Sequence, residues 1–414
     1  MHGRLEVIPV GSYRWTPLIL LEAANGASGV ANAMVMITIP WLVLQRTGSP
    51  ASAGLVMALA SLPGIVASPV VGWAVDRFGR RLVSIVSDIL SAASVAAIPL
   101  VAMTGDLSLG WILGLAILGA TFDPAGYTAR KALIPDVGEA SGFPTDRLNG
   151  IHEGVFAVGW TIGPLVGSVL IATIGAANSF WVPFALFLVA TACIVALRVG
   201  DAGQRARAAA PPDTGSAWSH AVLGAKVLWR DRALRALTLA IVVLAAVYMP
   251  TEAVVLPTYF EDLGSPGGLG IVISALAAGS MLGAFGYGWL SNRLTRYRLA
   301  RLTLIGTVIT IVPMALLPAL PIMVTAAFFL GLAWGPMNPL MNTLVQRRVP
   351  ADVQGRVYGF QLSLFYAAPP VAMLIVGWGI EQFGVQATYL VLAGLLAAVG
   401  LGVLLVRDIR DIDA

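Results

Sequence analysis

Long apolar stretches follow one another along almost the whole length of this chain. The first runs from Leu18 to Leu44, and others of similar length recur as far as residue 406. Crossing a hydrocarbon core of about 30 Å takes roughly 20 apolar residues in a helix. Because 58% of the 414 residues are hydrophobic and only 11% are charged, no sizeable soluble domain fits beside these stretches. The sequence therefore predicts an all-α membrane protein.

Twelve of the stretches are long enough to be transmembrane helices. We predict them at residues 16–45, 52–75, 82–104, 108–130, 149–174, 179–198, 234–260, 269–290, 299–319, 321–345, 357–380 and 385–406. Between the sixth and the seventh, the chain becomes rich in Ala, Pro, Gly and charged residues, which is typical of a linker. We therefore expect an N-terminal six-helix bundle at 1–200, a cytoplasmic linker at 201–232 and a C-terminal six-helix bundle at 233–414.

Lysine and arginine indicate the orientation, because they stay preferentially on the cytoplasmic side during insertion. With the N-terminus inside, 24 of the 25 basic residues lie in the termini and the inner loops, and Arg46 is the exception. We expect a multi-pass protein of the cytoplasmic (inner) cell membrane with both termini in the cytoplasm. The pI of 9.4 reflects an excess of basic residues, which this orientation places on the cytoplasmic side, where they can contact anionic lipids. The basic excess therefore does not indicate nucleic-acid binding, and we expect no nucleic-acid partner.

The two halves of the chain resemble each other. The segment Gly72–Arg77 has a counterpart in Gly288–Arg293, 216 residues later, and the pair Pro124 and Pro135 recurs at an offset of 215. Two separate markers at nearly one offset indicate a repeat. Parallel six-helix repeats form the architecture in which a site near the middle of the membrane opens alternately to each side.

The loop after the second predicted helix carries a defined pattern of glycine, acid and arginine. Its sequence GWAVDRFGRR fits Gly-x-x-x-Asp-Arg-x-Gly-Arg-Arg through Gly72, Asp76, Arg77, Gly79, Arg80 and Arg81. The acid can accept hydrogen bonds at a helix N-terminus, and the arginines can pair with acids or lipid phosphates. An ordinary inner loop would need only the arginines. The pattern resembles the inner loop of the major facilitator superfamily, which implies a twelve-helix major facilitator fold with this loop as a conformational switch.

A stripe of small residues lies in the fifth predicted helix. Gly159, Gly163, Pro164 and Gly167 fit Gly-x-x-x-Gly-Pro-x-x-Gly, which resembles the motif of drug:proton antiporters. Small residues at every fourth position also let helices pack closely in any membrane bundle, but the Gly-Pro pair favours an exporter. Many such antiporters carry an arginine inside the fourth helix. Arg130 lies at the predicted cytoplasmic end of its helix, so we do not assign it that proton-handling role.

Five further stretches narrow the resemblance to the third drug:proton antiporter family. They are Ile39–Ser49, Pro124–Asp136, Asp146–Glu153, Tyr248–Phe260 and Gly335–Arg348. An exporter of that family is described as carrying tetracyclines and aminoglycosides, so the resemblance implies multidrug efflux and antibiotic resistance. Substrate pockets diverge faster than scaffolds, so the substrate class is an expectation.

Acidic side chains inside the predicted helices are candidates for proton coupling, because ionisable groups in hydrocarbon usually face a cavity or a partner. The candidates are Glu252, Glu22, Asp123 and Glu153. For Glu153, and for Asp88, the favoured alternative is structural pairing with the basic inner loops. No Lys or Arg lies at the depth of Glu252, so two interpretations stay open for it: a proton-coupling carboxylate, or a carboxylic acid hydrogen-bonded to a helix backbone.

Histidine and cysteine give no metal-ligand pattern. We expect His152 and His220 at the inner surface in contact with water, and the single Cys193 lies in an apolar run. The chain also has no Gly-x-x-x-x-Gly-Lys loop, and no nucleophile with a general base stands out. We therefore expect no bound metal, no use of ATP as the energy source and no enzymatic activity. We expect the proton to be the coupling ion.

Amide and aromatic side chains are candidates for drug binding on the helices that usually line the cavity. They are Asn25, Asn32, Trp160, Trp334, Asn338, Asn342, Gln361, Phe365 and Tyr366. A mostly apolar cavity with a few amides and an acid suits amphipathic or cationic drugs. The alternative for each residue is helix packing or anchoring at the membrane interface.

Three functions fit the sequence. The leading one is a proton-coupled multidrug efflux transporter that works by alternating access as a monomer, with small-molecule drugs and membrane lipids as its partners. The second is a carrier of a physiological solute such as a siderophore, a lipid or a metabolite. The third, a receptor that transports nothing, is disfavoured by the intact inner loop and by Glu252.

Overall fold

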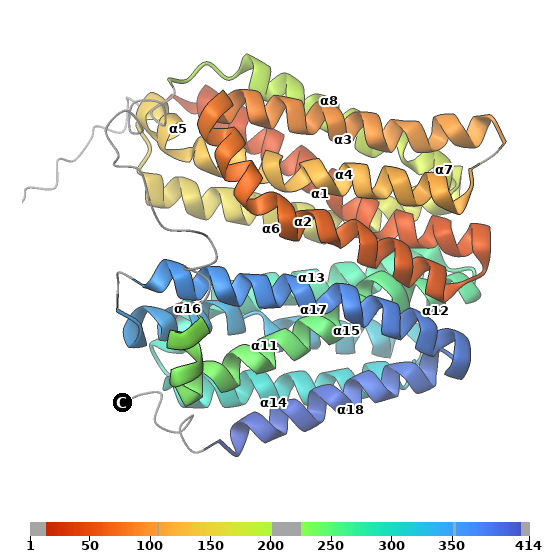
Figure 1. Ribbon diagram of the computed structural model, residues 1–414, viewed down its shortest axis with the longest axis vertical. Coiled ribbons are helices and arrows are strands. Elements are labelled where there is room, and N and C mark those ends of the chain that lie inside the picture. Colours follow the sequence, from red (N-terminus) through yellow and green to blue (C-terminus); the bar gives the residue numbers. More distant parts are fainter. Residues whose placement is uncertain (1–13, 106, 201–224, 351–352, 407–414) are drawn as a thin grey trace, which may run out of the picture.

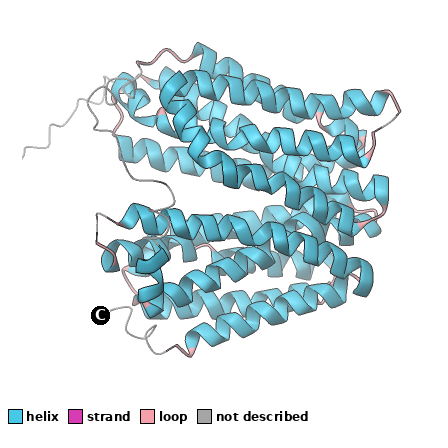
Figure 2. Cartoon of the chain, in the orientation of Figure 1, coloured by secondary structure: helices cyan, strands magenta, loops and turns pink. Residues whose placement is uncertain are grey.

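The computed structural model describes residues 14–105, 107–200, 225–350 and 353–406, without the side chains of residues 65–74, 76, 355, 359 and 362. Every regular element in these ranges is a helix (Figure 2). The N-terminal half contains α1 (Trp15–Thr47), α2 (Pro50–Phe78), α3 (Arg80–Met103), α4 (Leu109–Ala132), α5 (Ile134–Ser141), α6 (Thr145–Ile174), α7 (Ala176–Ser179) and α8 (Trp181–Ala196).

The C-terminal half repeats this arrangement with interruptions of its own. It contains α11 (Arg232–Pro250), the π-helical turn η1 (Thr251–Val255), α12 (Leu256–Asp262), α13 (Pro266–Ser291), α14 (Arg296–Ala315), α15 (Leu320–Trp334), α16 (Met337–Arg348), α17 (Gln354–Phe383) and α18 (Val385–Leu404). Figure 1 shows the two halves as separate bundles lying side by side.

The predicted helices all have counterparts in the structure. Eleven helices of the described chain are long and apolar enough to cross a membrane, and α2, which corresponds to the remaining predicted helix, has 29 residues. Two predicted helices are interrupted. The tenth is broken between α15 and α16 at Gly335 and Pro336, and the seventh contains η1 just before Pro257. Proline has no N–H for the helical hydrogen bond and its ring clashes with the preceding turn, so both interruptions lie where a regular helix is disfavoured.

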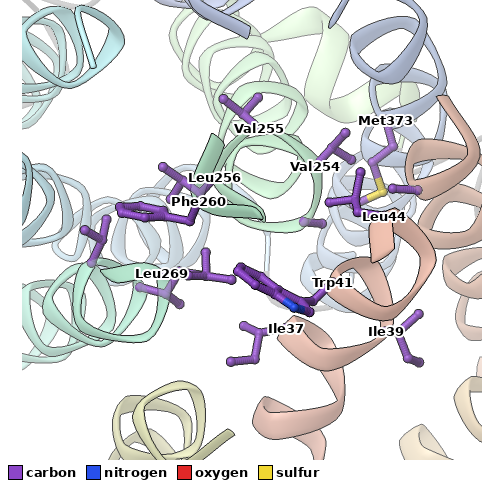
Figure 3. Close-up of a cluster of buried hydrophobic side chains, with 14 of the residues drawn as sticks. Ile37, Ile39, Trp41, Leu44, Val254, Val255, Leu256, Phe260, Leu269 and Met373 are labelled. Carbon is purple, nitrogen blue, oxygen red and sulfur yellow. The ribbon is translucent and has the colours of Figure 1, made fainter. Parts of the chain in front are cut away.

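The two halves share one apolar core at one end of the bundle. We call the end where α1 ends and α2 begins the far end, and the end where α8 ends and α11 begins the linker end. The shared core combines the last turns of α1 with η1, α12 and the first turns of α13. Figure 3 shows Ile37 and Trp41 of α1 beside side chains of the C-terminal half such as Leu269. Apolar burial therefore joins the halves at the far end.

At the linker end, each half has an apolar core of its own. One cluster there consists only of N-terminal residues, with Leu21, Ile134 and Ile194 among them, and another consists only of C-terminal residues, with Leu237, Leu344 and Val357 among them. The ribbons of the two halves also converge toward the far end and diverge toward the linker end in Figure 1. The bundle is thus packed shut at one end and divided at the other.

The most extensive contacts between the halves join α2 to α17 and α6 to α13. Glycines allow the backbones to approach at both. A Cβ atom added at Gly54 of α2 would collide with the carbonyl oxygen of Met373, and one added at Gly270 of α13 would collide with Ser168 of α6. The far-end closure therefore depends on small residues at two crossings.

Candidate functional site

Glu252 lies half-buried in η1, inside the C-terminal half. Its carboxyl group is hydrogen-bonded to the side chain of Tyr248, one turn earlier. The Tyr248 ring stacks on Trp334 of α15, with 6.4 Å between the ring centroids and an interplanar angle of 29°. The acid is therefore connected through one tyrosine to an aromatic side chain at the break between α15 and α16.

No ion pair involves Glu252 among the residues that the structure describes. The Tyr248 side chain is a partner that neither interpretation of the sequence named, and both interpretations of Glu252 stay predictions. A π-helical turn places one extra residue in the helix and is often found at functional sites. An acid without a counter-charge at such a turn can be stored in its neutral form and ionised only when water reaches it.

Arg130 lies in the last turn of α4, at the helix end where the sequence places it, but its side chain is buried inside the bundle. The side chain is 2% exposed, and its Nη1 lies 2.9 and 2.8 Å from the two carboxylate oxygens of Asp88 on α3. Its Nη2 donates to the hydroxyl oxygen of Ser28 on α1 at 2.8 Å. Gly126, one turn earlier, leaves room for the guanidinium group, because an added Cβ there would lie 3.3 Å from Nη1. Asp88 thus has a buried arginine as its partner, and the pair ties three helices together.

Asp123 lies two turns from Arg130 on the same helix and is half-buried. It accepts a hydrogen bond from the Ser91 hydroxyl of α3 at 2.7 Å and is hydrogen-bonded to the Asn32 side chain of α1. Asp123 therefore belongs to the same polar network between α1, α3 and α4 as the Asp88–Arg130 pair. Asn32, a predicted drug-binding residue, is engaged by this network.

His152 of α6 is fully buried and is not at a hydrated surface, which contradicts its predicted placement. Its Nδ1 lies 3.1 Å from Oε1 of Glu22 on α1. The Asn25 amide donates to Glu22 Oε2 at 3.3 Å and to the backbone carbonyl of His152 at 2.9 Å. Glu22, a predicted proton-coupling residue, therefore has a titratable partner, and Asn25, a predicted drug-binding residue, holds the pair together.

Glu153 has the basic partner that its structural interpretation required. Lys131 Nζ lies 2.6 Å from Glu153 Oε1, and the side chains are 49% and 48% exposed. The Tyr127 hydroxyl is 3.3 Å from the same carboxylate oxygen. Because the pair is so exposed, its contribution to stability is small.

The predicted switch loop connects the helices of the N-terminal half. Arg80 forms an ion pair with Asp136 of α5, with 2.8 Å between Nη1 and Oδ2. Arg81 donates to the Ile194 carbonyl at 2.9 Å and to the Val195 carbonyl. These carbonyls lie at the C-terminal end of α8, where a cation is favoured by the helix dipole. The loop therefore fixes the linker ends of α3, α5 and α8 relative to one another.

The structure describes fewer contacts for the other members of the loop. Gly79 has a φ of 90° between α2 and α3, a conformation that L side chains rarely adopt, and Arg77 is exposed. Gly72 and Asp76 lie outside the described side chains, so their predicted contacts stay predictions.

The predicted antiporter motif lines the contact between α6 and α1. An added Cβ at Gly159 would lie 3.2 Å from the Val30 amide nitrogen, and one at Gly163 would lie 2.9 Å from the Val30 carbonyl oxygen. Gly167 likewise faces Ile37, and Pro164 is buried in the same helix. The motif therefore brings two backbones together, directly beyond the Glu22–His152 pair along the same two helices.

The predicted drug-binding residues are divided between the halves. Trp160 lies in a run of rings with Phe156 and Tyr127, whose centroids are 6.0 and 4.7 Å apart in succession. Gln361 donates to the Thr238 hydroxyl at 2.8 Å, and Phe365 packs edge-on against Tyr366. The exposed members are Asn338, Asn342 and Tyr366, whereas Trp160, Trp334, Gln361 and Phe365 are half-buried. Tyr127, Phe156 and Tyr248 join these surfaces although the sequence did not single them out.

Comparisons with known proteins give matches over nearly the whole chain. The profile of the Major Facilitator Superfamily matches residues 23–369 and 253–412. Multidrug efflux pump Tap of Mycolicibacterium fortuitum is 36% identical over 404 residues, covering 96% of this chain and 97% of that protein. The Mycobacterium tuberculosis protein of the same name is 35% identical, with 96% and 95% covered. Macrolide efflux protein A of Streptococcus pyogenes is 22% identical, with 94% and 96% covered.

Solved structures share the fold at low sequence identity. Nucleoside transporter NupG superposes with a TM-score of 0.76 at 11% identity, covering 94% of this chain and 98% of the other. A D-xylose-proton symporter gives a TM-score of 0.72 at 14% identity, with 95% and 97% covered. At these identities the likeness concerns the architecture of two six-helix halves and not the substrate.

Proposed function

The chain belongs to the Major Facilitator Superfamily, and we propose that it is a multidrug efflux transporter that exchanges protons for amphipathic drugs such as tetracyclines and aminoglycosides. The proposal places the protein in the cytoplasmic membrane as a monomer, with the linker end in the cytoplasm, because nearly all lysines and arginines are expected there.

One observation carries the transport mechanism: the halves share an apolar core at the far end and have separate cores at the linker end. A carrier that alternates between two openings needs such an asymmetry, because each state must be packed shut on one side. With the linker end in the cytoplasm, this structure corresponds to the state that takes up drug from inside the cell. Export follows when the halves rock about the crossings of α2 with α17 and α6 with α13.

Three observations support amphipathic drugs as the substrate class. Relatives that are 36% and 35% identical are named multidrug efflux pumps, and a more distant one is named a macrolide efflux protein. Each half also presents a half-buried tryptophan in a group of aromatic rings, Trp160 beside Phe156 and Trp334 beside Tyr248. Aromatic faces bind both the apolar surface and the cationic groups of such drugs.

Glu252 is the group that best suits the proton step. Neither Glu252 nor Asp123 has an ion-pair partner among the described residues, whereas Glu22, Asp88 and Glu153 are each paired, and Asp123 accepts a hydrogen bond from Ser91. Ionisation of Glu252 would change its hydrogen bond with Tyr248 and so the position of the ring stacked on Trp334. Proton occupancy and the aromatic surface would then be linked through one side chain. A proton taken up from outside and released to the cytoplasm would drive one export cycle.

Everted membrane vesicles that contain the protein test the proposal. When a proton gradient acidifies the vesicle interior, the vesicles should accumulate a tetracycline, and a protonophore should abolish the accumulation. Glu252→Gln should reduce it to the level of vesicles without the protein, because glutamine keeps a hydrogen bond to Tyr248 but cannot carry a proton. The matched control is Glu139→Gln, an exposed acid on α5, which should transport like the unchanged protein.

Accumulation that persists with a protonophore present would contradict proton coupling. Normal accumulation by Glu252→Gln would leave the proton coupling standing and would remove Glu252 from the proton step. Failure to accumulate any of a tetracycline, an aminoglycoside and a macrolide would contradict drug export itself.

A further inference from the structure

The Glu22–His152 pair is a buried contact between two titratable groups on different helices. The imidazole is fully buried, Glu22 is 9% exposed, and 3.1 Å separates Nδ1 from Oε1. Asn25 donates to both the Glu22 carboxylate and the His152 backbone carbonyl. The three residues therefore join α1 to α6 through polar contacts, with His152 two turns before Gly159, the first glycine of the antiporter motif.

A carboxyl group and an imidazole at this distance can hold one proton between them. With that proton the pair carries no net charge, and without it the pair carries one negative charge. A net charge is costly to bury, so release of the proton favours a less tightly packed surrounding. The Nε2 atom of His152 is buried without a hydrogen-bond partner among the described residues. The ring is thus held from one side only, and no second acceptor fixes its protonation.

The surroundings of the pair contain few other charges. Tyr127 of α4 places its ring 6.2 Å from the His152 ring, and its hydroxyl group is directed to the Lys131–Glu153 ion pair, where the two charges compensate each other. Short α5 and the last turn of α8 contribute apolar side chains to the core around this part of α1 and α6. Glu22 and His152 are therefore in contact with each other and with no other ion pair among the described residues.

An open apolar cavity lies next to the pair. Its volume is about 400 Å³, and it lies between α1 and α6, with Gly26 and Ile151 among its lining residues. Gly26 is one turn from Glu22, and Ile151 precedes His152. Gly154, which also lines the cavity, approaches Phe285 of the C-terminal half, so the cavity borders the contact between the halves. An apolar molecule that enters it reaches the helix pair held by Glu22 and His152.

We propose that Glu22 and His152 form a second proton-binding site, separate from Glu252, which holds one exchangeable proton while α1 and α6 are packed together and releases it to water at the linker end when drug enters between these helices. The inference rests on the proposed function, because a proton site matters only to a proton-driven carrier. His152 is a positioning and proton-binding residue in this scheme, and the drug is not required to touch it.

Proton release on drug binding tests the pair. The full-length protein in detergent, in weakly buffered medium with a pH-indicator dye, is mixed with a tetracycline, and the protons released per bound drug are counted. Glu22→Gln and His152→Gln should each lower this count by up to one proton, and the double variant should lower it no further, because both residues hold the same proton. Glu252→Gln combined with His152→Gln should instead show additive losses, since those sites are independent.

The variants retain polar side chains, and size-exclusion chromatography together with tetracycline binding verifies that they fold. A variant that does not fold is replaced by Glu22→Asp, which keeps the acid and should retain release. An unchanged proton count in both single variants, or an additive loss in the double variant, would overturn the shared site while leaving proton-driven export intact. Drug accumulation that is insensitive to a protonophore would instead overturn the proposed function.

Discussion

The Glu381 carboxylate of α17 accepts hydrogen bonds from the Ser49 hydroxyl and, at 3.3 Å, from the Ala51 amide at the start of α2. One acid of the C-terminal half thus caps a helix N-terminus of the N-terminal half, where a negative charge is favoured. The contact lies at the far end, where the shared apolar core also closes the bundle. Glu381 therefore adds hydrogen bonds between the two halves at an end that is otherwise held closed by apolar packing.

Glu381→Gln should make the far end open more often. Loss of a charge-assisted hydrogen bond at an exposed site should raise the open population roughly two- to fivefold. The measurement is the labelling rate of a cysteine introduced as Val254→Cys, a fully buried position of the shared core, in a Cys193→Ala background. Glu261→Gln, another acid near the far end, is the control and should leave the rate unchanged. Equal labelling rates in both variants would show that the Glu381 hydrogen bonds do not stabilise the closed far end.

Asp88→Asn should destabilise the N-terminal half strongly. It leaves the Arg130 guanidinium buried without its counter-charge, and breaking a buried pair in this way costs about 3–5 kcal/mol. The thermal unfolding midpoint in detergent should fall markedly. Arg301→Ala, on an exposed position of α14, serves as the control and should have little effect. An unfolding midpoint within a degree or two of the unchanged protein would show that the pair is not needed for the fold.

Gly163→Val should push α1 away from α6. The added side chain would meet the Val30 carbonyl oxygen and the Ala33 methyl group, and overpacking of this kind costs about 1–3 kcal/mol. Drug accumulation and thermal stability should both decrease. Gly150→Val on the same helix is the matched control, because nothing lies within 4 Å of a Cβ atom there. If both variants behave alike, the loss reflects helix propensity and not the packing of α6 on α1.

Asp136→Asn should slow turnover without weakening equilibrium drug binding. It removes the ion pair with Arg80, which holds α5 against the start of α3 far from the aromatic surfaces. Initial rates of accumulation and equilibrium binding measured by tryptophan fluorescence separate the two effects. Glu139→Gln, three residues further along α5 and exposed, should change neither. Weaker binding with a normal rate would assign Asp136 to the drug site.

Much of the architecture follows from the sequence, because each helix must fill the thickness of the membrane with apolar residues. The same physics predicts that Glu153 pairs with a basic group, since an acid near a helix end lies among the inner loops. It does not predict the breaks at Pro336 and before Pro257, because a proline in a membrane helix can be tolerated in several ways. The choice among them depends on neighbouring helices.

His152 was misplaced because its nearness to a helix end indicated exposure, but it is buried against Glu22 of α1, and α5 contributes to the apolar core around this part of α1 and α6. Exposure at a helix end depends on what packs over it, which a single helix does not reveal. A signal was nevertheless present: His152 precedes Gly159 by seven residues, or two turns, and so shares the face that the glycines present to α1.

The internal repeat allows Arg130 of the Asp88–Arg130 pair to be compared with the corresponding position of the C-terminal half. Pro124 and Pro135 recur as Pro339 and Pro350, and at that offset Arg130 corresponds to Val345 of α16, which is also fully buried. After an ancestral six-helix unit was duplicated, one copy thus filled this position with a charge and the other with a methyl-bearing side chain. A six-helix bundle of this design can be built without the ion pair. The two copies have therefore diverged in side-chain chemistry at a position that both of them bury.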